Sequence, residues 1–310
     1  MLSLPLLAML QAATGQSAAT SRMDHVGVGV RDLKAATESF TRLGFVVSPG
    51  GRHPGGTENN LIFFPDGSYL ELLGVHDSTK AADMAARFRK REGAFFAGLR
   101  VGSAEGIATW LKSRYKNVEV VGPVGGTIQL PTDTGTPPNR WWIVSFKEQA
   151  WPFPSLFFLE YEPAFLAQTR ESLRTQGAFK HLNSASRLYA AWFATFNPDS
   201  VVGPLEGMGM RVDRPVGADR LGAFARVARL EGGAIVVLQP KAPDGSAAEY
   251  ARAGSGVMGV TFAVKSVDSV LRSLRVEGQP PKPYAGLFGR SVLIGPMEAH
   301  GAWVEFAEIP

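Results

Sequence analysis

The sequence contains no cysteine among its 310 residues. This absence excludes disulfide bonds, zinc–thiolate sites and thiol nucleophiles, so any metal ligand or nucleophile must come from other side chains. Histidine is scarce as well, with only five in the chain. Because histidine serves as both a metal ligand and an acid–base group, the position of each one in the fold matters.

The chain also has little clustered charge. Charged residues make up 19% of it and the net charge is only +4. The densest cluster, RFRKR at residues 87–91, is typical of the solvated face of a helix. The aromatic segments RWWIVSF (140–146) and WPFPSLFF (151–158) have no basic groove beside them, so we expect no nucleic-acid partner. Their aromatic residues fit better in a barrel core or a pocket wall.

Long apolar runs are absent, and no segment has the roughly 18 residues that a membrane span needs. The run LSLPLLAML (residues 2–10) is shorter and precedes a stretch of small residues. This order resembles a secretory signal. We therefore predict a signal peptide over residues 1–20 and an exported, periplasmic or extracellular protein. A disordered N-terminus on a cytoplasmic protein is the alternative.

What the chain does contain is a repeated order of elements. Residues 23–32 alternate and are rich in valine, which indicates a strand, and residues 33–43 have helical apolar spacing. Three further strands are predicted at 45–49, 60–64 and 69–75. The unit is therefore βαβββ.

Three more copies follow with little sequence identity. The second covers residues 95–162, and the fourth covers residues 256–308. The third begins with a strand at 181–186 and continues with a predicted helix over 187–197. Two such units side by side form a curled sheet of about eight strands with helices outside. We predict an α+β protein with two cups, over residues 21–162 and 178–310, joined by a helical linker at 163–177.

The string DHV…VRDL…LGF…PGGRHPGGTEN…YLEL resembles the glyoxalase-like domain family. This family belongs to the vicinal oxygen chelate superfamily, which includes glyoxalases, bleomycin-resistance proteins and extradiol dioxygenases. The resemblance covers about residues 23–162 and is strongest in the first copy. It implies a small-molecule ligand and a divalent metal ion (Zn, Mn, Ni or Fe) inside a cup.

The resemblance also implies a ligand set for each cup. In the first strand, His25 points away from the valines, toward the predicted cup interior. By resemblance, the candidate metal ligands are His25, Glu71 and Glu160 in the first cup and His181, Gln239 and Glu305 in the second. The strand that often carries a fourth ligand has Ala97 or Gly98 there, which departs from the family pattern.

Residues 50–60, GGRHPGGTENN, are predicted to form a hairpin loop at the mouth of the first cup. The loop lacks the lysine of a phosphate-binding P-loop. The candidate rim residues are His53, Asn59, Asn60 and Trp142.

These expectations favour a glyoxalase-like lyase or isomerase. Its metal ion would hold two adjacent substrate oxygens and stabilise an enolate, with Glu71 or Glu160 as general base. A non-catalytic protein of the bleomycin-resistance type, which sequesters a small molecule, is the alternative. In a third interpretation, one cup is degenerate and serves as a scaffold. The protein is expected to be a monomer or a homodimer.

Overall fold

The computed structural model describes residues 21–116, 118–130, 133–147, 155–253, 256–275 and 281–310. The first two βαβββ modules contain β1 (Arg22–Gly29), α1 (Leu33–Arg42), β2 (Ser48–Arg52), β3 (Thr57–Phe63), β4 (Tyr69–Val75), α2 (Ala82–Lys90), β5 (Gly93–Arg100), α3 (Ala104–Arg114), β6 (Val120–Thr127), β7 (Asn139–Phe146) and β8 (Leu156–Tyr161). Helix α4 (Pro163–Thr175) follows them in the chain.

The remaining modules contain β9 (Ala185–Ala194), α5 (Asp199–Gly207), β10 (Val216–Ala218), the 3-10 turn η2 (Asp219–Leu221), β11 (Ala223–Leu230), β12 (Gly233–Pro240), α6 (Ser246–Arg252), β13 (Val257–Val264), α7 (Val267–Ser273), β14 (Tyr284–Ala285), β15 (Arg290–Ile294) and β16 (Trp303–Glu308).

The strands form two sheets of eight with the same internal order. The first cup is β2-β3-β4-β1-β5-β8-β7-β6, and the second is β10-β11-β12-β9-β13-β16-β15-β14. In each cup the first strand of a module pairs in parallel with the last strand of the same module, and the two modules meet along an antiparallel pair. The predicted architecture of four βαβββ modules in two curled sheets is confirmed.

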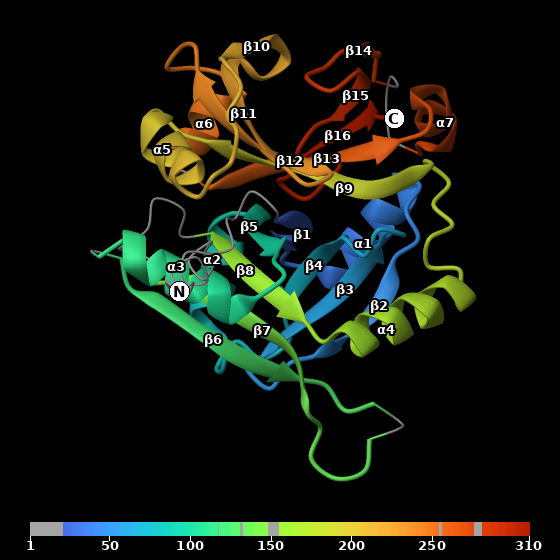
Figure 1. Cartoon of the computed structure of the whole chain (residues 1–310). Helices are drawn as coiled ribbons and strands as arrows, with labels where there is room; N and C mark the ends of the chain where they lie inside the picture. Colours follow the sequence, from blue (N-terminus) through green and yellow to red (C-terminus); the bar gives the residue numbers. More distant parts are fainter. Residues whose placement is uncertain (1–20, 117, 131–132, 148–154, 254–255, 276–280) are drawn as a thin grey trace, which may run out of the picture.

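The two cups pack back to back (Figure 1). Their middle strands touch, β1 against β9 and β5 against β13, and the buried side chains of both sheets form one shared apolar core. Helices α1, α3, α5 and α7 flank this core. We call the face of each sheet toward the core the outer face and the opposite, concave face the inner face.

The third module departs from the prediction at its start. Residues 187–194 were expected in a helix, but they belong to strand β9, and residues 181–184 precede it as a loop. The run RLYAAWFA is apolar on both faces because β9 lies in the middle of its sheet and is covered on both sides. A strand buried on both faces loses the alternation that distinguishes it from a buried helix. The helix of this module is α5.

The hairpin loop predicted at residues 50–60 is shorter than expected, because most of these residues belong to strands. Gly50–Arg52 extend β2, and Thr57–Asn60 belong to β3, so only residues 53–56 form the turn. Gly56 has a φ of +91°, in the left-handed region where glycine is favoured. Its carbonyl accepts hydrogen bonds from His76 and Asp77, which ties the turn to the end of β4.

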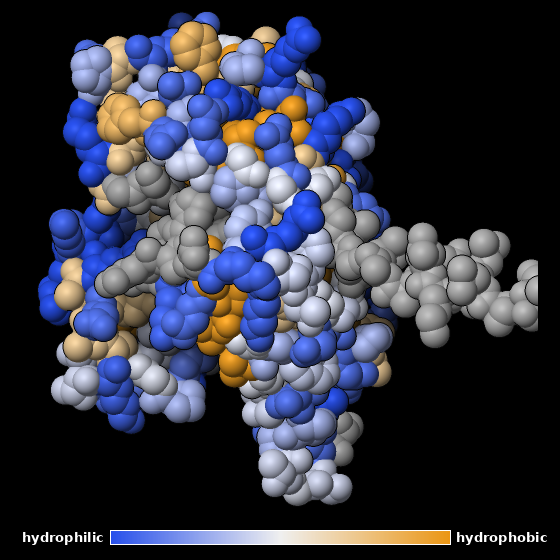
Figure 2. Space-filling model, turned by 60° about the vertical axis from the view of Figure 1, so that its left-hand side comes forward, coloured by the Kyte–Doolittle hydropathy of each residue, from blue (hydrophilic) through white to orange (hydrophobic). Residues whose placement is uncertain are grey.

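Hydrophilic side chains dominate the face of the molecule in Figure 2, and apolar atoms show in small, separate areas. Within the described part of the chain, no helix has the length and apolar character that crossing a membrane requires.

Phe45 tests the shared core, because its ring belongs to the first module and packs on the second cup. The ring centroid lies 4.9 Å from that of Phe262 and 5.5 Å from that of Phe306. We expect Phe45→Ala to lower the free energy of unfolding by about 3–5 kcal/mol, with one cooperative transition in urea. The matched control Phe196→Ala, at a residue that is 49% exposed, should change it by less than about 0.5 kcal/mol. Two transitions, of which only one shifts, would contradict a shared core.

Candidate functional site

The inner face of the first cup holds a buried aspartate–histidine pair on β1. The β1–β5 register shifts between Met23 and His25, which removes Asp24 from the regular alternation of the strand. Asp24 is fully buried and His25 is 5% exposed. His25 Nδ1 lies 2.7 Å from Asp24 Oδ1.

Two further side chains hold Asp24. Arg100 on β5 donates from Nε and Nη2 to Asp24 Oδ2 over 2.8 and 2.6 Å, and Tyr161 on β8 donates to Oδ1 over 3.0 Å. Burial opposes ionisation, but the hydrogen bond from His25 and the charge of Arg100 outweigh it and lower the pKa of Asp24. Asp24 is therefore a carboxylate and can only accept hydrogen bonds.

The tautomer of His25 follows from this arrangement. Because Asp24 only accepts, His25 Nδ1 must carry the hydrogen, and a neutral ring then has its lone pair on Nε2. Among the residues that the structure describes, Nε2 has no hydrogen-bond partner and is not among the fully buried unpaired atoms. The pair thus presents a basic nitrogen to the inner face.

Aromatic rings surround this nitrogen. Tyr69 stacks on the imidazole with the ring centroids 4.4 Å apart, and Phe96 and Phe157 meet it edge-on at 5.3 Å. The Tyr69 hydroxyl donates a hydrogen bond to Tyr161. Burial raises the pKa of each phenol well above the ordinary tyrosine value. Both hydroxyls therefore stay protonated and complete a chain of donors that ends at Asp24.

Glu71 shares this face on the neighbouring parallel strand. In the β1–β4 register, His25 pairs with Tyr69 and Gly27 with Glu71, so His25 and Glu71 project to the same side. The Asn59 amide donates to Glu71 Oε1 over 2.7 Å, and its carbonyl oxygen accepts from the Gly51 N–H over 3.0 Å. The structure thus brings together the predicted residues His25, Glu71 and Asn59.

Two residues that were predicted to line the first cup, Glu160 and Trp142, lie on its outer face. Glu160 Oε2 accepts a hydrogen bond of 2.7 Å from the Ala104 N–H, at the N-terminus of α3. This bond places the side chain under the helix, on the outer face, where a carboxylate is stabilised by the helix dipole. Trp142 pairs with Glu160 and also packs toward the shared core. The inner-face residue at this end of β8 is Tyr161.

The other rim candidates are held within the strands and turns. Asn60 also points to the outer face, because its amide donates to Thr37 Oγ1 on α1 over 2.8 Å. His53 lies in the hairpin turn, where its Nδ1 is 2.7 Å from Thr57 Oγ1. A contact between His53 and a bound molecule therefore stays a prediction.

His181 is not in the second cup. It precedes β9 and lies between the sheets, where its Nδ1 accepts from the Val46 N–H over 3.0 Å and its Nε2 donates to the Phe63 carbonyl over 2.9 Å. Burial lowers its pKa, so the ring is neutral and structural. Gln239 follows the outer-face residues Ile235 and Val237 at two-residue spacing and also points away from the cup.

The donor set therefore does not fit a metal ion. In the described parts of the chain, no three His, Asp or Glu side chains come close enough together to hold one. In the first cup, Gly98 on β5 pairs with His25 on β1. A Cβ at position 98 would lie 2.8 Å from Leu159 Cδ1 and 3.1 Å from the His25 ring. The imidazole and Leu159 thus occupy the space that a fourth ligand would need. The predicted divalent cofactor is not supported by these residues.

The second cup encloses a cavity of about 580 Å³ on its inner face. Residues 216–221 and 284–287 form its two sides, from opposite edges of the curled sheet, and Trp192 and Glu305 contribute from the middle strands. This volume lies in the usual range for small-molecule sites. Glu305 is the only residue of the predicted second ligand set that lies here.

Glu305 is 2% exposed and accepts a set of directed hydrogen bonds. The Trp192 indole donates to Thr261 Oγ1 over 2.9 Å, and that hydroxyl donates to Glu305 Oε2 over 2.7 Å. Tyr284 donates to Oε1 over 2.6 Å. Burial raises the pKa of Glu305, and hydrogen bonds from Tyr284, Thr261 and Ser291 offset this only in part.

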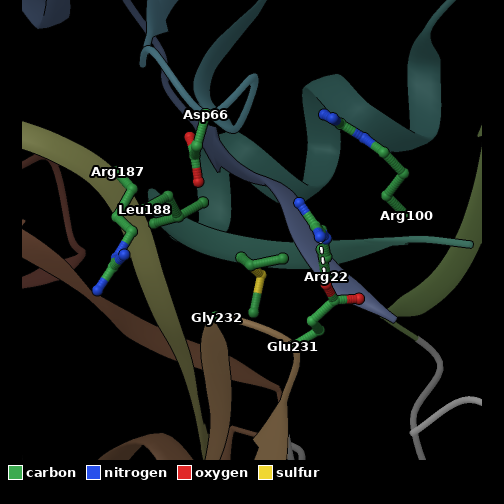
Figure 3. A pocket seen from close by; sticks show the side chains of 8 residues that line it. Arg22, Asp66, Arg100, Arg187, Leu188, Glu231 and Gly232 are labelled. Carbon is green, nitrogen blue, oxygen red and sulfur yellow. Dashed lines mark hydrogen bonds and ion pairs between the residues drawn. The ribbon is translucent and has the colours of Figure 1, made fainter. Parts of the chain in front are cut away.

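A smaller crevice of about 170 Å³ lies between the sheets (Figure 3). Arg100 and Arg187 stand on opposite sides of it, and Arg22 forms an ion pair with Glu231. Arg100 is already paired with Asp24, and Arg187 donates from Nη2 to the Pro310 carbonyl. Because the crevice is small and Arg22 and Arg100 already have acidic partners, it is a weaker candidate than either cup.

Sequence reasoning missed the residues that organise both sites. Asp24 and Arg100 are far apart in the chain, and only the β1–β5 pairing joins them. Tyr284 and Thr261 reach Glu305 from two other strands. One available signal was a charged residue in an otherwise apolar strand, as with Asp24 in β1 and Glu305 in β16, since a buried charge requires a partner.

The two curled sheets of paired βαβββ modules, each with a few polar groups on a largely apolar inner face, have the architecture of the vicinal oxygen chelate class. The chain belongs to the glyoxalase-like domain family, because the model of that family matches residues 23–208, more than half of its length. The match extends past α4 into β9 and α5. No curated protein sequence matches the chain.

A solved structure shares this fold over most of the chain. A hypothetical protein from Staphylococcus aureus superposes with a TM-score of 0.63 at 18% identity, over 93% of this chain and 100% of its own. Methylmalonyl-CoA epimerase from Mycobacterium tuberculosis gives a TM-score of 0.37 at 18% identity, over 41% of this chain and 90% of its own. A Streptomyces coelicolor methylmalonyl-CoA epimerase gives 0.37 at 22% identity, over 41% and 99%.

The donor geometry predicts weak metal binding. After incubation with Zn²⁺, Mn²⁺ or Ni²⁺ and desalting, we expect elemental analysis to find only substoichiometric metal, with His25→Ala indistinguishable from wild type. One equivalent of metal in the wild type that is lost in His25→Ala would contradict this expectation.

The raised pKa of Glu305 makes a prediction about stability against pH. The folded protein holds this proton more tightly than the unfolded chain does, so the stabilisation is complete below the ordinary glutamate pKa of about 4.3 and is lost as pH rises through the raised value. Urea unfolding should therefore show Glu305→Gln gaining stability relative to wild type as pH rises across that window. A difference that stays constant with pH would count against a buried titrating group. The matched variant Glu249→Gln, on the exposed face of α6, should show no such trend.

Proposed function

We propose that the protein is an acid–base enzyme acting on a small oxygen-bearing molecule in its first cup, with His25 and Glu71 as the groups that exchange protons. The observation that carries this proposal is the 2.7 Å contact between Asp24 and His25 Nδ1, which leaves Nε2 free on the inner face. Membership of the glyoxalase-like domain family supports a small-molecule function for this face.

Asp24 gives His25 the properties of a general base. It fixes the ring in the tautomer whose Nε2 accepts a proton, and its negative charge stabilises the imidazolium that results. Arg100 and Tyr161 keep Asp24 ionised and in place. A C–H group next to a carbonyl would lose its proton to Nε2; the C–H electron pair would form the C=C bond of an enolate, and the π pair of the carbonyl would move to its oxygen. The reverse step returns the proton to carbon.

Glu71 supplies a second acid–base group on the same face. Asn59 orients its carboxyl group, so the proton of a neighbouring carbon or oxygen can be exchanged there. Two such groups suit an isomerisation, in which one removes a proton and the other delivers one. The rings of Tyr69, Phe96 and Phe157 suit the apolar part of a substrate. Because Glu160 lies on the outer face, no step in this proposal involves a chelated metal ion.

Binding without turnover is the second candidate. It is favoured by the low exposure of His25 and by the aromatic rings packed around it, which leave less access than an open catalytic cleft. In this case the first cup would sequester an apolar molecule and Asp24 would serve the stability of the cup.

Hydrogen–deuterium exchange at carbon distinguishes the two candidates. We expect the wild type to accelerate exchange of the C–H protons of small α-hydroxy ketones and α-keto acids in D₂O, followed by proton NMR. Loss of the general base in His25→Ala should slow this exchange roughly 100-fold or more. Asp24→Asn should slow it as well, because the tautomer is no longer fixed.

The control variant is His76→Ala, at a histidine beyond the end of β4, and it should exchange at the wild-type rate. Undiminished exchange in His25→Ala would contradict the role of His25. Tight binding of a compound with no catalysed exchange would favour sequestration.

A further inference from the structure

The second cup has features of a ligand site that the proposed chemistry of the first cup does not use. Its cavity of about 580 Å³ is lined largely by apolar side chains, including Trp192, Leu221, Leu287 and the ring of Tyr284. Its charged lining residues are Asp219, Arg220 and Glu305, and of the two carboxylates that of Glu305 is the buried one. An apolar cavity with one deeply placed charge selects a ligand of matching shape and opposite charge.

The hydrogen bonds around Glu305 all deliver donors to it. An indole N–H can only donate, so the Thr261 hydroxyl accepts from Trp192 and turns its own hydrogen to Glu305 Oε2. Tyr284 delivers a second hydrogen to Oε1. This network is arranged for a carboxylate, whose two oxygens offer about four acceptor positions, and it leaves room for a further donor.

No Lys, Arg or His hydrogen-bonds this carboxylate within the described residues, and Arg220, a cation that lines the same cavity, lies over the Tyr284 ring with its guanidinium carbon 5.3 Å from the centroid. The groups that act on Glu305 are three hydroxyls, and no Lys, Arg or His is among them. Asp219, the other acid that lines the cavity, already forms an ion pair with Lys241. A buried carboxylate without a positive partner is costly, and a ligand that brings the charge recovers part of that cost.

The backbone of Gly286, which lines the cavity, packs closely against the carboxylate. A Cβ at this position would lie 2.4 Å from Ser291 Oγ and 2.6 Å from Glu305 Oε1. Only glycine therefore fits beside this oxygen without displacing it. Arg220 already lies over the Tyr284 ring, but the Trp192 ring lies in the same cavity, and aromatic faces attract organic cations.

We propose that the second cup binds a small primary ammonium ion carried on an aromatic or apolar body, with Glu305 as its charge partner. The ammonium group donates to the carboxylate beside Gly286, and the body of the ligand fills the cavity between β10 and β14. Such a site is independent of the first cup and needs no metal ion.

Isothermal titration with 2-phenylethylamine and 2-phenylethanol tests this proposal, because the two probes share one body and differ in charge. We expect the wild type to bind the amine and to bind the alcohol at least tenfold more weakly, since a charge-assisted hydrogen bond contributes roughly tenfold or more. Glu305→Gln should weaken amine binding by a similar factor and leave alcohol binding unchanged. Glu249→Gln is the matched control and should bind both probes as the wild type does.

Gly286→Ala provides a second test, because it keeps the carboxylate but places a methyl group where Ser291 Oγ and Glu305 Oε1 must shift to make room. It should also lower affinity for the amine, which separates access to Glu305 from any effect of the glutamine on folding. His25→Ala should bind the amine normally. Equal binding of amine and alcohol, unchanged amine binding in both Glu305→Gln and Gly286→Ala, or no binding of the amine by the wild type would each overturn the proposal.

Discussion

The back-to-back packing of the two sheets decides which side chains can reach a ligand. It buries the outer faces of both cups in one apolar core, so the two candidate sites lie on the inner faces. Because strand residues alternate between the faces, a change of one position moves a side chain from the site into the core or under a helix. Glu160 and Tyr161 illustrate this, since the first holds the end of α3 and the second reaches Asp24.

The fold was largely predictable from the order of elements, because glycine, proline and alternating segments separate the modules clearly. The placement of His25 and Glu71 on the inner face was also predictable, since each lies in a short strand whose apolar neighbours fix the outer face. Strand β9 was not, because burial on both faces removes the alternation on which the prediction depends. Glu160 was assigned to the wrong face for a related reason: β8 carries large apolar side chains on both sides.

The partners of the site residues could not be predicted, because they come from distant parts of the chain. Asp24 is joined to Arg100 only by strand pairing, and a register shift in β1 is needed to place it beside His25. This network changes the chemistry expected from the family resemblance. The histidine expected to hold a metal ion is oriented by a buried carboxylate, its strand neighbours in the described part of the chain supply too few further ligands, and the place of one of them is taken by Gly98 and its neighbours. The two cups thus share a fold but differ in their polar groups: an internally paired network in one and a single buried carboxylate, Glu305, in the other.

The central claim is that Asp24 fixes the tautomer of His25 and leaves Nε2 free to accept a proton. Two-bond ¹⁵N–¹H correlation spectra of histidine-labelled protein, recorded where the imidazole is neutral and assigned with His25→Ala, measure this directly. The account predicts that the His25 hydrogen is on Nδ1 in the wild type and that this preference weakens in Asp24→Asn. A hydrogen on Nε2 in the wild type would contradict it.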